Sequence, residues 1–280
     1  MKTKSLLFML MCSTLLFVFF NACKKEDTKN DNPEQVSSAN NNAMAEAIFS
    51  ETKTIGDQAS TGSLSTFIPE TQTTLLSSCA TISLDTTSTP HKIIIYFGTT
   101  NCLCGDGNYR RGKINISFTG HYRDSATVIT FTFDNYAEND NLVDNSTTKT
   151  ITNKGRNSSG HYNYTIAVNA KIYPVNGGSF TWISTRNNEW IAGYNTPFIW
   201  LDDVYLITGS SSGVGTNGKA YSMTISNSNP LRVQLNCAWI TKGSITMVEG
   251  LISLLLDYGT GACDRIATVT LFGNTYQITL

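Results

Sequence analysis

A two-residue alternation of apolar and polar side chains runs through much of the chain from Thr81 onward and limits its fold more than any other feature. In the segment YNYTIAVNAKI, the residues that share one face are Tyr162, Tyr164, Ile166, Val168, Ala170 and Ile172. Polar turn clusters such as VNGG separate segments of this kind, and no helical segment is available for a parallel crossover. Because hairpin connections can be short, we predict an all-β fold, an antiparallel meander that forms either a sandwich or a curled sheet.

One segment before the strands has helical spacing instead. The residues at intervals of three or four are Met44, Ile48, Glu51 and Ile55. Asparagines that can cap a helix precede them and Gly56 follows, so we predict one short amphipathic N-terminal helix over residues 43–59. Residues 23–42 contain almost nothing apolar, which predicts a disordered tether. The antiparallel β domain is then expected over residues 60–280.

The first 22 residues have the layout of an export signal, with lysines, an apolar stretch and small residues before Cys23. This stretch is similar to a bacterial lipoprotein signal, which implies that residues 1–22 are removed and that Cys23 is acylated. The KKED sequence after Cys23 resembles the surface-export tag of Bacteroidetes lipoproteins. These resemblances imply an outer-membrane protein that is anchored by its lipid and faces the cell exterior. An ordinary secretory signal, with Cys23 available for a disulfide, is the alternative.

The cysteines of the β domain occur in a repeated order. CATI…YFGTTNC and CAWI…DYGTGAC both contain Cys-Ala-x-Ile, a strand, an aromatic residue and Gly-Thr-x-x-Cys, which a duplication would explain. Cysteines of exported proteins oxidise, so we predict the disulfides Cys79–Cys102 and Cys237–Cys263. Cys104 is left over and is an alternative partner in place of Cys102. The CLC sequence supplies too few ligands for a structural zinc ion, so no metal site is predicted.

The order of motifs between Cys79 and Leu280 resembles a family of uncharacterised Bacteroidetes lipoproteins. These motifs include YFGTTNC, TGHYRD, ITFTFDNY, DDVYLITG and LDYGTGACD. The resemblance implies a lipoprotein with a cysteine-containing β domain. The resemblance implies no particular activity, and no functional residue is assigned from it.

The charge content excludes one class of partner. Charged residues make up 15% of the chain, the formal net charge is −1, and no long block of like charge follows the N-terminal region. Nucleic acid binding requires a clustered basic surface, so we expect no nucleic acid partner. In CGDGNYRRGKI, alternation sends Arg110 to one face and Arg111 and Lys113 to the other, which favours a hairpin turn over an anion site. The histidines lack metal-ligand spacing, and we predict no cofactor.

Four carboxylates that lie among aromatic residues are the candidates for catalysis. They are Glu189, Asp202, Asp203 and Asp257. A glycosidase needs two facing carboxylates, roughly 5 to 10 Å apart, so a polysaccharide-acting hydrolase is one hypothesis. In the interpretation that we favour, Asp202 and Asp203 form a turn between two strands and Asp257 caps a strand end.

Tryptophans are the candidates for ligand binding. Trp182 and Trp239 follow the apolar alternation and are predicted to lie inside the domain. Trp190 and Trp200 remain as candidates for an exposed platform on which sugar rings stack. The sequence therefore favours a non-catalytic surface lipoprotein whose β domain binds a glycan or a surface protein, or has a structural role in the envelope. The hydrolase is the alternative function.

Overall fold

Antiparallel strands make up most of the computed structural model, which describes residues 33–62, 76, 79–196, 200–237 and 239–279. Within these ranges the elements other than strands are helix α2 (Pro33–Gly62) and the 3₁₀ turn η1 (Trp200–Asp202). The strands are β1 (Thr81–Asp85), β2 (His91–Tyr96), β3 (Cys102–Leu103), β4 (Tyr109–Phe118), β5 (Val128–Glu138), β6 (Asn141–Val143), β7 (Thr148–Arg156), β8 (Tyr162–Tyr173), β9 (Phe180–Ala192), β10 (Val204–Val214), β11 (Ala220–Ile225), β12 (Leu231–Gln234), β13 (Lys242–Glu249), β14 (Ile252–Thr260), β15 (Ile266–Leu271) and β16 (Asn274–Thr279).

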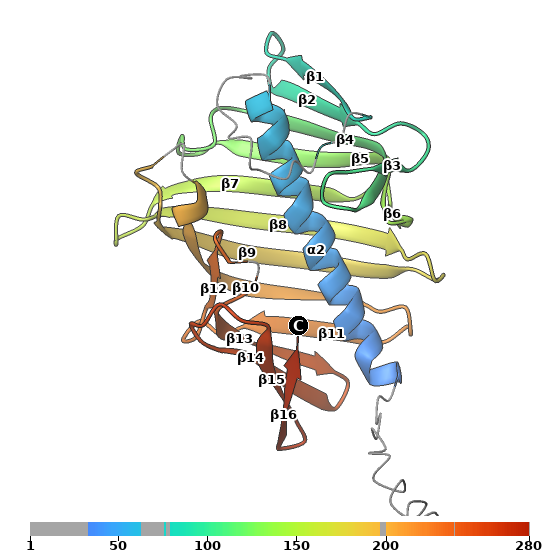
Figure 1. Ribbon diagram of the computed structural model, residues 1–280, viewed down its shortest axis with the longest axis vertical. Coiled ribbons are helices and arrows are strands. Elements are labelled where there is room, and N and C mark those ends of the chain that lie inside the picture. The colour runs from blue at the N-terminus through green and yellow to red at the C-terminus, as the bar shows by residue number, and fades with distance from the viewer. Residues whose placement is uncertain (1–32, 63–75, 77–78, 197–199, 238, 280) are drawn as a thin grey trace, which may run out of the picture. The chain divides into compact units, whose positions relative to one another are not determined.

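All the described strands belong to one sheet (Figure 1). Its main order is β1-β2-β4-β5-β6-β8-β9-β10-β11-β13-β14-β15-β16, while β3 pairs with β4, β7 joins β5 to β8, and β12 joins β10 to β13. The predicted all-β antiparallel fold is therefore confirmed. Of the two predicted arrangements, the sandwich is not formed by the described strands, because they follow one continuous path. Figure 1 shows α2 lying across one face of this sheet, and β12, β15 and β16 running steeply to the other strands.

The face of the sheet that α2 covers, called here the inner face, carries the core. Tyr164 and Ile172 of β8 are fully buried on it, and so are Phe180 and Trp182 of β9. The alternate residues of the same strands point to the opposite, outer face, which is half-buried to exposed. The two-residue period of the sequence therefore arises because α2 packs on only one side of the sheet.

Helix α2 begins at Pro33 rather than at residue 43, so the prediction of a disordered tether is wrong for residues 33–42. The reason is that polar side chains dock this part of the helix. Asn41 Oδ1 accepts a hydrogen bond from the backbone N–H of Thr216 at 2.9 Å, and Asn42 Oδ1 accepts one from Trp182 Nε1 at 2.8 Å. Buried hydrogen bonds hold this turn to the sheet where the apolar pattern is missing.

Gly56 lies within α2 and does not end it, because the helix continues to Gly62. A Cβ atom at Gly56 would lie 2.9 Å from Ile116 Cδ1 and 3.1 Å from Phe131 Cε1. The missing side chain therefore lets the helix pack directly on Ile116 and Phe131, although glycine costs a helix about 1 kcal/mol relative to alanine.

Both predicted disulfides form. The Cα atoms are 6.1 Å apart in Cys79–Cys102 and 5.9 Å apart in Cys237–Cys263. Cys104 is a buried free thiol, and its Sγ donates to the backbone carbonyl of Cys102 at 3.6 Å. The repeated cysteine order of the sequence thus corresponds to two separate disulfides, one near each end of the sheet.

Several sequence predictions concern residues outside the described ranges. They are the signal peptide 1–22, the acylation of Cys23 and the part of the tether before Pro33. The side chain of Trp200 also lies outside the described part. Among the described residues, no helix has both the length and the hydrophobicity that crossing a bilayer requires.

Candidate functional site

Glu189 is the first of the four predicted carboxylates. It adjoins Trp190 in β9 and therefore points to the outer face. Its Oε1 lies 2.7 Å from Nδ1 of His161 and accepts a 2.7 Å hydrogen bond from Nδ2 of Asn157. The contact with His161, and then that with Asn157, lowers the pKa of Glu189. A carboxyl group that stays ionised in this way is suited to orienting His161 rather than to donating a proton.

The other three carboxylates do not converge with Glu189. Asp202 ends η1, is exposed, and accepts a 2.6 Å hydrogen bond from the hydroxyl group of Thr196. Asp203 lies between η1 and β10, in the connection between two strands where the turn interpretation places it, and its side chain is buried. Asp257 lies in β14 and accepts a 2.7 Å hydrogen bond from the N–H of Gly259. None of these hydrogen bonds joins two of the four carboxyl groups, and the Asp202 charge raises the pKa of the neighbouring Asp203.

Trp190, one of the two candidates for an exposed platform, is 4% exposed and therefore does not form one. The guanidinium carbon of Arg123 lies 4.8 Å from its ring centroid, and the ring of Tyr205 stacks on it at 5.7 Å. Trp190 is eight positions after Trp182 in one strand, so both face inward, and this parity was visible in the sequence. Trp182 is buried as predicted, whereas Trp239 is half-buried with Arg265 5.1 Å from its ring centroid.

Trp190 belongs to a group of aromatic rings at the adjoining ends of β8, β9 and β10, called here the aromatic cluster. Its members are Tyr122, Tyr162, Tyr164, Trp190, Tyr194 and Tyr205. Arg156 lies 4.1 Å from the ring centroid of Tyr162 and 5.2 Å from that of Tyr194, while Lys53 of α2 lies 5.0 Å from that of Tyr122. Each such contact contributes about 0.5–2 kcal/mol. Cations from α2, from the β4–β5 loop and from the end of β7 therefore fix the rings in place.

A line of polar atoms extends from this cluster along the inner face of β9, and we call it the β9 polar row. Three successive inward-facing residues each carry a buried polar atom that has no hydrogen-bond partner among the described residues: Ser184 Oγ, Arg186 Nη1 and Asn188 Oδ1. Trp190 Nε1, the next in line, has no well-aligned acceptor, although its N–H lowers the pKa of the Asp203 carboxyl group. Tyr164 pairs in register with Asn188, and its buried hydroxyl group also has no hydrogen-bond partner among the described residues. Because roughly 90% or more of buried polar groups are hydrogen-bonded, a row of exceptions indicates missing external partners, either ligand or water.

The β9 polar row carries little net charge. Arg186 Nη2 forms an ion pair with Glu46 of α2 and a 3.4 Å hydrogen bond with the hydroxyl group of Ser211. Burial raises the pKa of Tyr164, so this hydroxyl group is neutral. Burial also raises the pKa of Asp203, against a lowering by the nearby indole N–H of Trp190. The row therefore offers both donors and acceptors, with its one strong cation already paired.

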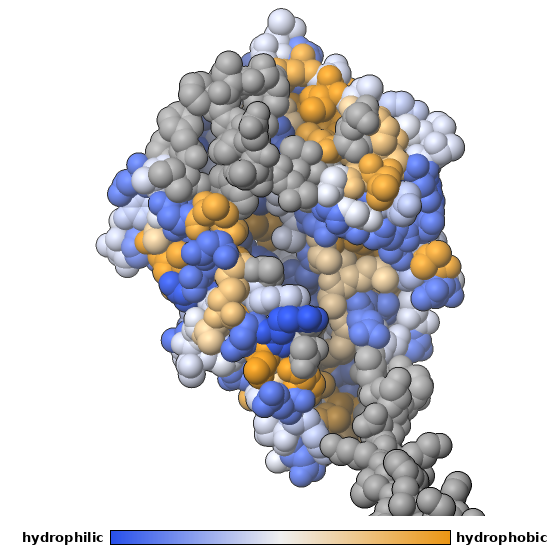
Figure 2. Space-filling model, in the orientation of Figure 1, coloured by the Kyte–Doolittle hydropathy of each residue, from blue (hydrophilic) through white to orange (hydrophobic). Residues whose placement is uncertain are grey.

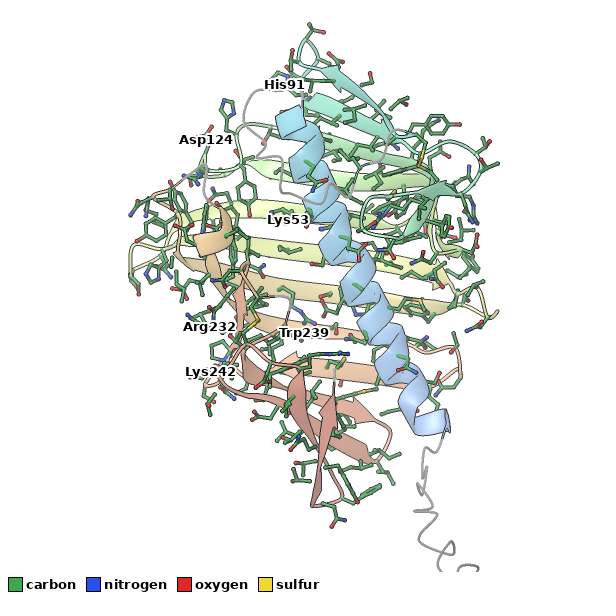
Figure 3. All side chains as sticks on the ribbon, viewed as in Figure 1. Lys53, His91, Asp124, Arg232, Trp239 and Lys242 are labelled. Atoms are coloured by element: carbon green, nitrogen blue, oxygen red, sulfur yellow. A yellow bond between two sulfur atoms is a disulfide. The ribbon has the colours of Figure 1, made fainter. Side chains whose placement is uncertain are left out.

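The β9 polar row and the aromatic cluster lie on the same flank of α2. Glu46 and Lys53, seven residues apart on the helix, make the contacts to Arg186 and Tyr122. Figure 3 labels Lys53 on this flank and Trp239 further along it. Figure 2 shows the surface hollowed on this side of the helix, at the level of the central strands. No sequence motif announced the arrangement.

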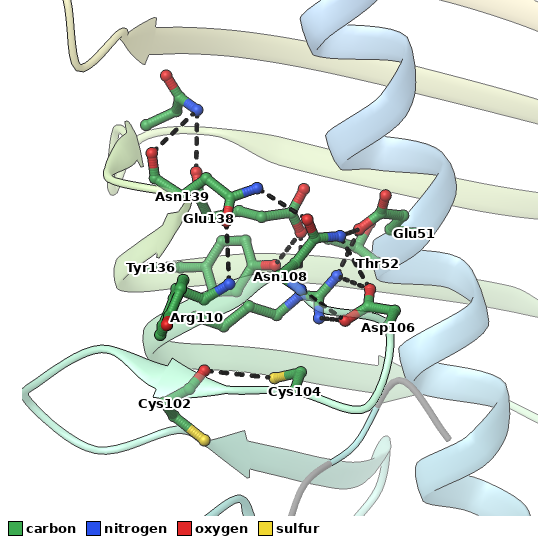
Figure 4. A network of polar contacts seen from close by, with 12 residues as sticks. Glu51, Thr52, Cys102, Cys104, Asp106, Asn108, Arg110, Tyr136, Glu138 and Asn139 are labelled. Atoms are coloured by element: carbon green, nitrogen blue, oxygen red, sulfur yellow. Dashed lines mark hydrogen bonds and ion pairs between the residues drawn. The ribbon is translucent and has the colours of Figure 1, made fainter. Parts of the chain in front are cut away.

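On the opposite flank, α2 contacts a buried charge network (Figure 4). Arg110 is fully buried and donates to Glu138 at 3.0 Å, to Asp106 at 2.7 and 2.9 Å, and to Glu51 of α2. Burial and then the Glu51 charge raise the pKa of Glu138 to about 7, against the opposing effect of Arg110. The predicted alternation is correct, since Arg110 points inward and away from Arg111. Because these side chains satisfy one another, we interpret the network as a structural link.

The described ranges contain no group of three or more His, Cys, Asp or Glu side chains that is arranged to hold a metal ion. The candidate site therefore consists of the β9 polar row and the aromatic cluster. Comparisons of the chain with protein-family models, with curated proteins and with solved structures give no match.

Proposed function

We propose that the protein is a lipid-anchored outer-membrane protein of the Bacteroidetes type whose β domain binds a glycan without catalysis. The anchor is Cys23, as the resemblance of residues 1–22 to a lipoprotein signal implies. The binding site is the β9 polar row with the neighbouring aromatic cluster. The observation that carries the proposal is the set of unpartnered polar atoms on successive inward-facing residues of β9.

The chemistry of the row favours a neutral, polyhydroxylated ligand. Arg186 and Tyr164 can donate hydrogen bonds, while Asn188 Oδ1 can accept them. Sugar hydroxyl groups both donate and accept, so one ligand can serve both kinds of atom. An anionic ligand would compete with Glu46 for Arg186, which is already paired. Leaving a buried donor or acceptor unpaired costs about 1–3 kcal/mol, so a ligand that pairs several of them gains affinity.

Glycan binding by the mature chain with Cys23→Ser, which keeps the protein soluble, tests the site. We expect a neutral oligosaccharide from an array to bind, and we expect Asn188→Ala to weaken it about tenfold, which corresponds to about 1.4 kcal/mol. Asn176→Ala is the matched control, because Asn176 lies in the exposed β8–β9 loop and belongs to neither face of the strands. Equal affinities of the two variants, or an array without a bound glycan, would refute this assignment.

The location is tested separately by protease shaving of intact cells that express the native chain or Cys23→Ala. We expect the native β domain to be degraded from outside and the variant to be released from the membrane. A native β domain that resists protease until the envelope is broken would place it in the periplasm. That result would overturn the proposed exterior location and leave the binding site to be tested on its own.

A further inference from the structure

The outer face of the sheet carries three rows of uncharged residues, called here the hydroxyl rows. Backbone pairing aligns one residue from each successive strand into a row. The central row is Ser117, Thr130, Thr150, Ala167, Thr185, Ser210, Thr224 and Thr246. All of these residues are half-buried or exposed. The row crosses eight strands, from β4 to β13.

The flanking rows have the same character. One is Asn115, Thr132, Thr148, Asn169, Ile183, Ser212, Ser222 and Val248, and the other is Val128, Thr152, Thr165, Asn187 and Thr208. Charged outward residues lie at an end of the rows or beside them. The exposed Lys92 of β2 pairs in register with Ser117 at one end of the central row. Lys113 and Asp134, for example, pair with each other at 3.1 Å at the border of the Asn115 row.

Strand preference explains only part of this pattern. Threonine suits exposed strands because it is β-branched and polar. Lys, Glu, Arg and Asp are nevertheless among the most exposed residues of proteins, and oppositely charged pairs across strands are a common stabilising device. Their absence from three adjoining rows therefore indicates that the outer face is kept neutral for a reason other than strand formation.

We propose that the hydroxyl rows are a contact surface for an extended, uncharged polysaccharide. Neighbouring strands lie about 4.8 Å apart and alternate residues of a strand about 6.8 Å apart, so hydroxyl and methyl groups repeat on a regular grid. A polymer of identical sugar units presents hydroxyl groups and apolar ring faces that also repeat. The surface and the polymer can therefore make the same contact many times.

Charge complementarity selects the neutral polymer. A polyanion or an acidic headgroup would find no cation within the rows, and its desolvation would go uncompensated. A protein partner fits less well, because interface cores are enriched in aromatic residues, Met and Arg, which the rows lack. The surface is independent of the β9 polar row, which lies on the inner face.

Sedimentation of the mature Cys23→Ser protein with insoluble cellulose, chitin, xylan or starch granules tests the proposal. We expect at least one of them to retain the protein, and we expect Thr150→Lys with Thr185→Lys to weaken retention at least tenfold by placing two cations in the central row. Ser158→Lys, in the exposed β7–β8 loop, is the matched control for added charge. Unchanged thermal unfolding would confirm that the variants are folded.

A milder double variant, Thr150→Val with Thr185→Val, removes the hydroxyl groups and keeps the shape. It should weaken retention several-fold, while Asn188→Ala should leave it unchanged because that residue faces inward. The proposal is overturned if no polysaccharide retains the protein, if the lysine and valine variants bind like the parent, or if Ser158→Lys abolishes retention as well. If only Asn188→Ala lost retention, all glycan binding would be assigned to the β9 polar row on the inner face, and the proposal for the hydroxyl rows would be wrong.

Discussion

Asn42 shows how one polar side chain can fix a helix to a sheet. Its Oδ1 accepts hydrogen bonds from Trp182 Nε1 at 2.8 Å and from the hydroxyl group of Ser211 at 2.9 Å. Both donors come from the inner face of the sheet, and both Asn42 and Trp182 are buried. Because both donors are buried, neither can bond to water instead of Asn42. A polar residue is therefore needed at a helix position that faces the core, where an apolar residue would be expected.

We predict that Asn42→Ala destabilises the protein by about 2–4 kcal/mol, because two buried donors lose their acceptor and each costs about 1–2 kcal/mol. Urea denaturation followed by tryptophan fluorescence measures this change. Asn40→Ala is the matched control, since Asn40 is exposed on the same helix, and it should change stability little. Equal stabilities of the two variants would mean that the N-terminal half of α2 is not held by these bonds.

The limits of sequence reasoning are also clear at single residues. The position of Trp190 could have been predicted from the parity that it shares with Trp182. The role of Gly56 could not, because it depends on Ile116 and Phe131, which follow far along the chain. A glycine that ends a helix and a glycine over which a sheet packs look the same in one sequence.

At the scale of elements, the Arg110 network links α2, the loop before β4 and β5. Glu51, Asp106 and Glu138 share one buried guanidinium group, and Tyr136 donates a 3.1 Å hydrogen bond to Glu138. Three carboxyl groups around one cation carry excess negative charge when all are ionised. Burial and repulsion from Glu51 therefore favour the protonated form of Glu138 in the folded state.

This arrangement predicts a pH dependence of stability. The pKa of Glu138 is about 7 in the folded state, against an ordinary value of 4.5 for a glutamate carboxyl group, so the folded state binds more protons between these values. The contribution of Glu138 to the free energy of unfolding is fully present below pH 4.5. It is lost as the pH rises through 7, by up to about 1.4 kcal/mol per pH unit.

We expect Glu138→Gln to flatten the unfolding free energy between pH 5 and pH 7.5, because the amide stays neutral and can still accept from Arg110 Nε. Urea denaturation across this range provides the measurement. Glu189→Gln is the control, since the pKa of Glu189 is lowered and this group stays ionised throughout. A parent protein whose stability does not fall between these two pH values would contradict the prediction.

The helix was also the element that sequence reasoning described least well. Its C-terminal half carries the apolar residues Ile48, Phe49 and Ile55, and this half was predicted. Its N-terminal half carries Ser38, Asn41 and Asn42 on the buried stripe, and it resembled a tether because composition alone does not reveal distant hydrogen-bond partners. The strands were predictable because their period depends only on which face is covered.

At the scale of the whole molecule, the two disulfides hold the ends of the sheet. Cys79–Cys102 ties the segment before β1 to β3, and Cys237–Cys263 ties the β12–β13 connection to the β14–β15 connection. The repeated motif made these pairs predictable. The continuous sheet was not predictable, because alternation is the same in a sandwich and in a single curled layer.

Opening either disulfide should destabilise the protein by about 2–4 kcal/mol, since each closes a loop of moderate length. Thermal unfolding of Cys237→Ser with Cys263→Ser measures this for the C-terminal end. Peptide mapping of the unreduced protein should show the two predicted crosslinks, and Cys104 should react with alkylating reagents only after unfolding, because it is buried. A crosslink that contains Cys104 would contradict the structure.

The position of α2 has a consequence for how the chain acquires its fold. Synthesis produces the helix before any of the described strands, yet Ser37 and Asn41 contact Thr216, which is 179 and 175 residues away. During synthesis the buried stripe of the helix therefore stays uncovered until the β10–β11 hairpin has emerged. Contacts of such long range slow folding and prolong exposure to aggregation. The helix is thus made before the described strands but is completed only after β10 and β11, and its buried stripe is open to aggregation in this interval.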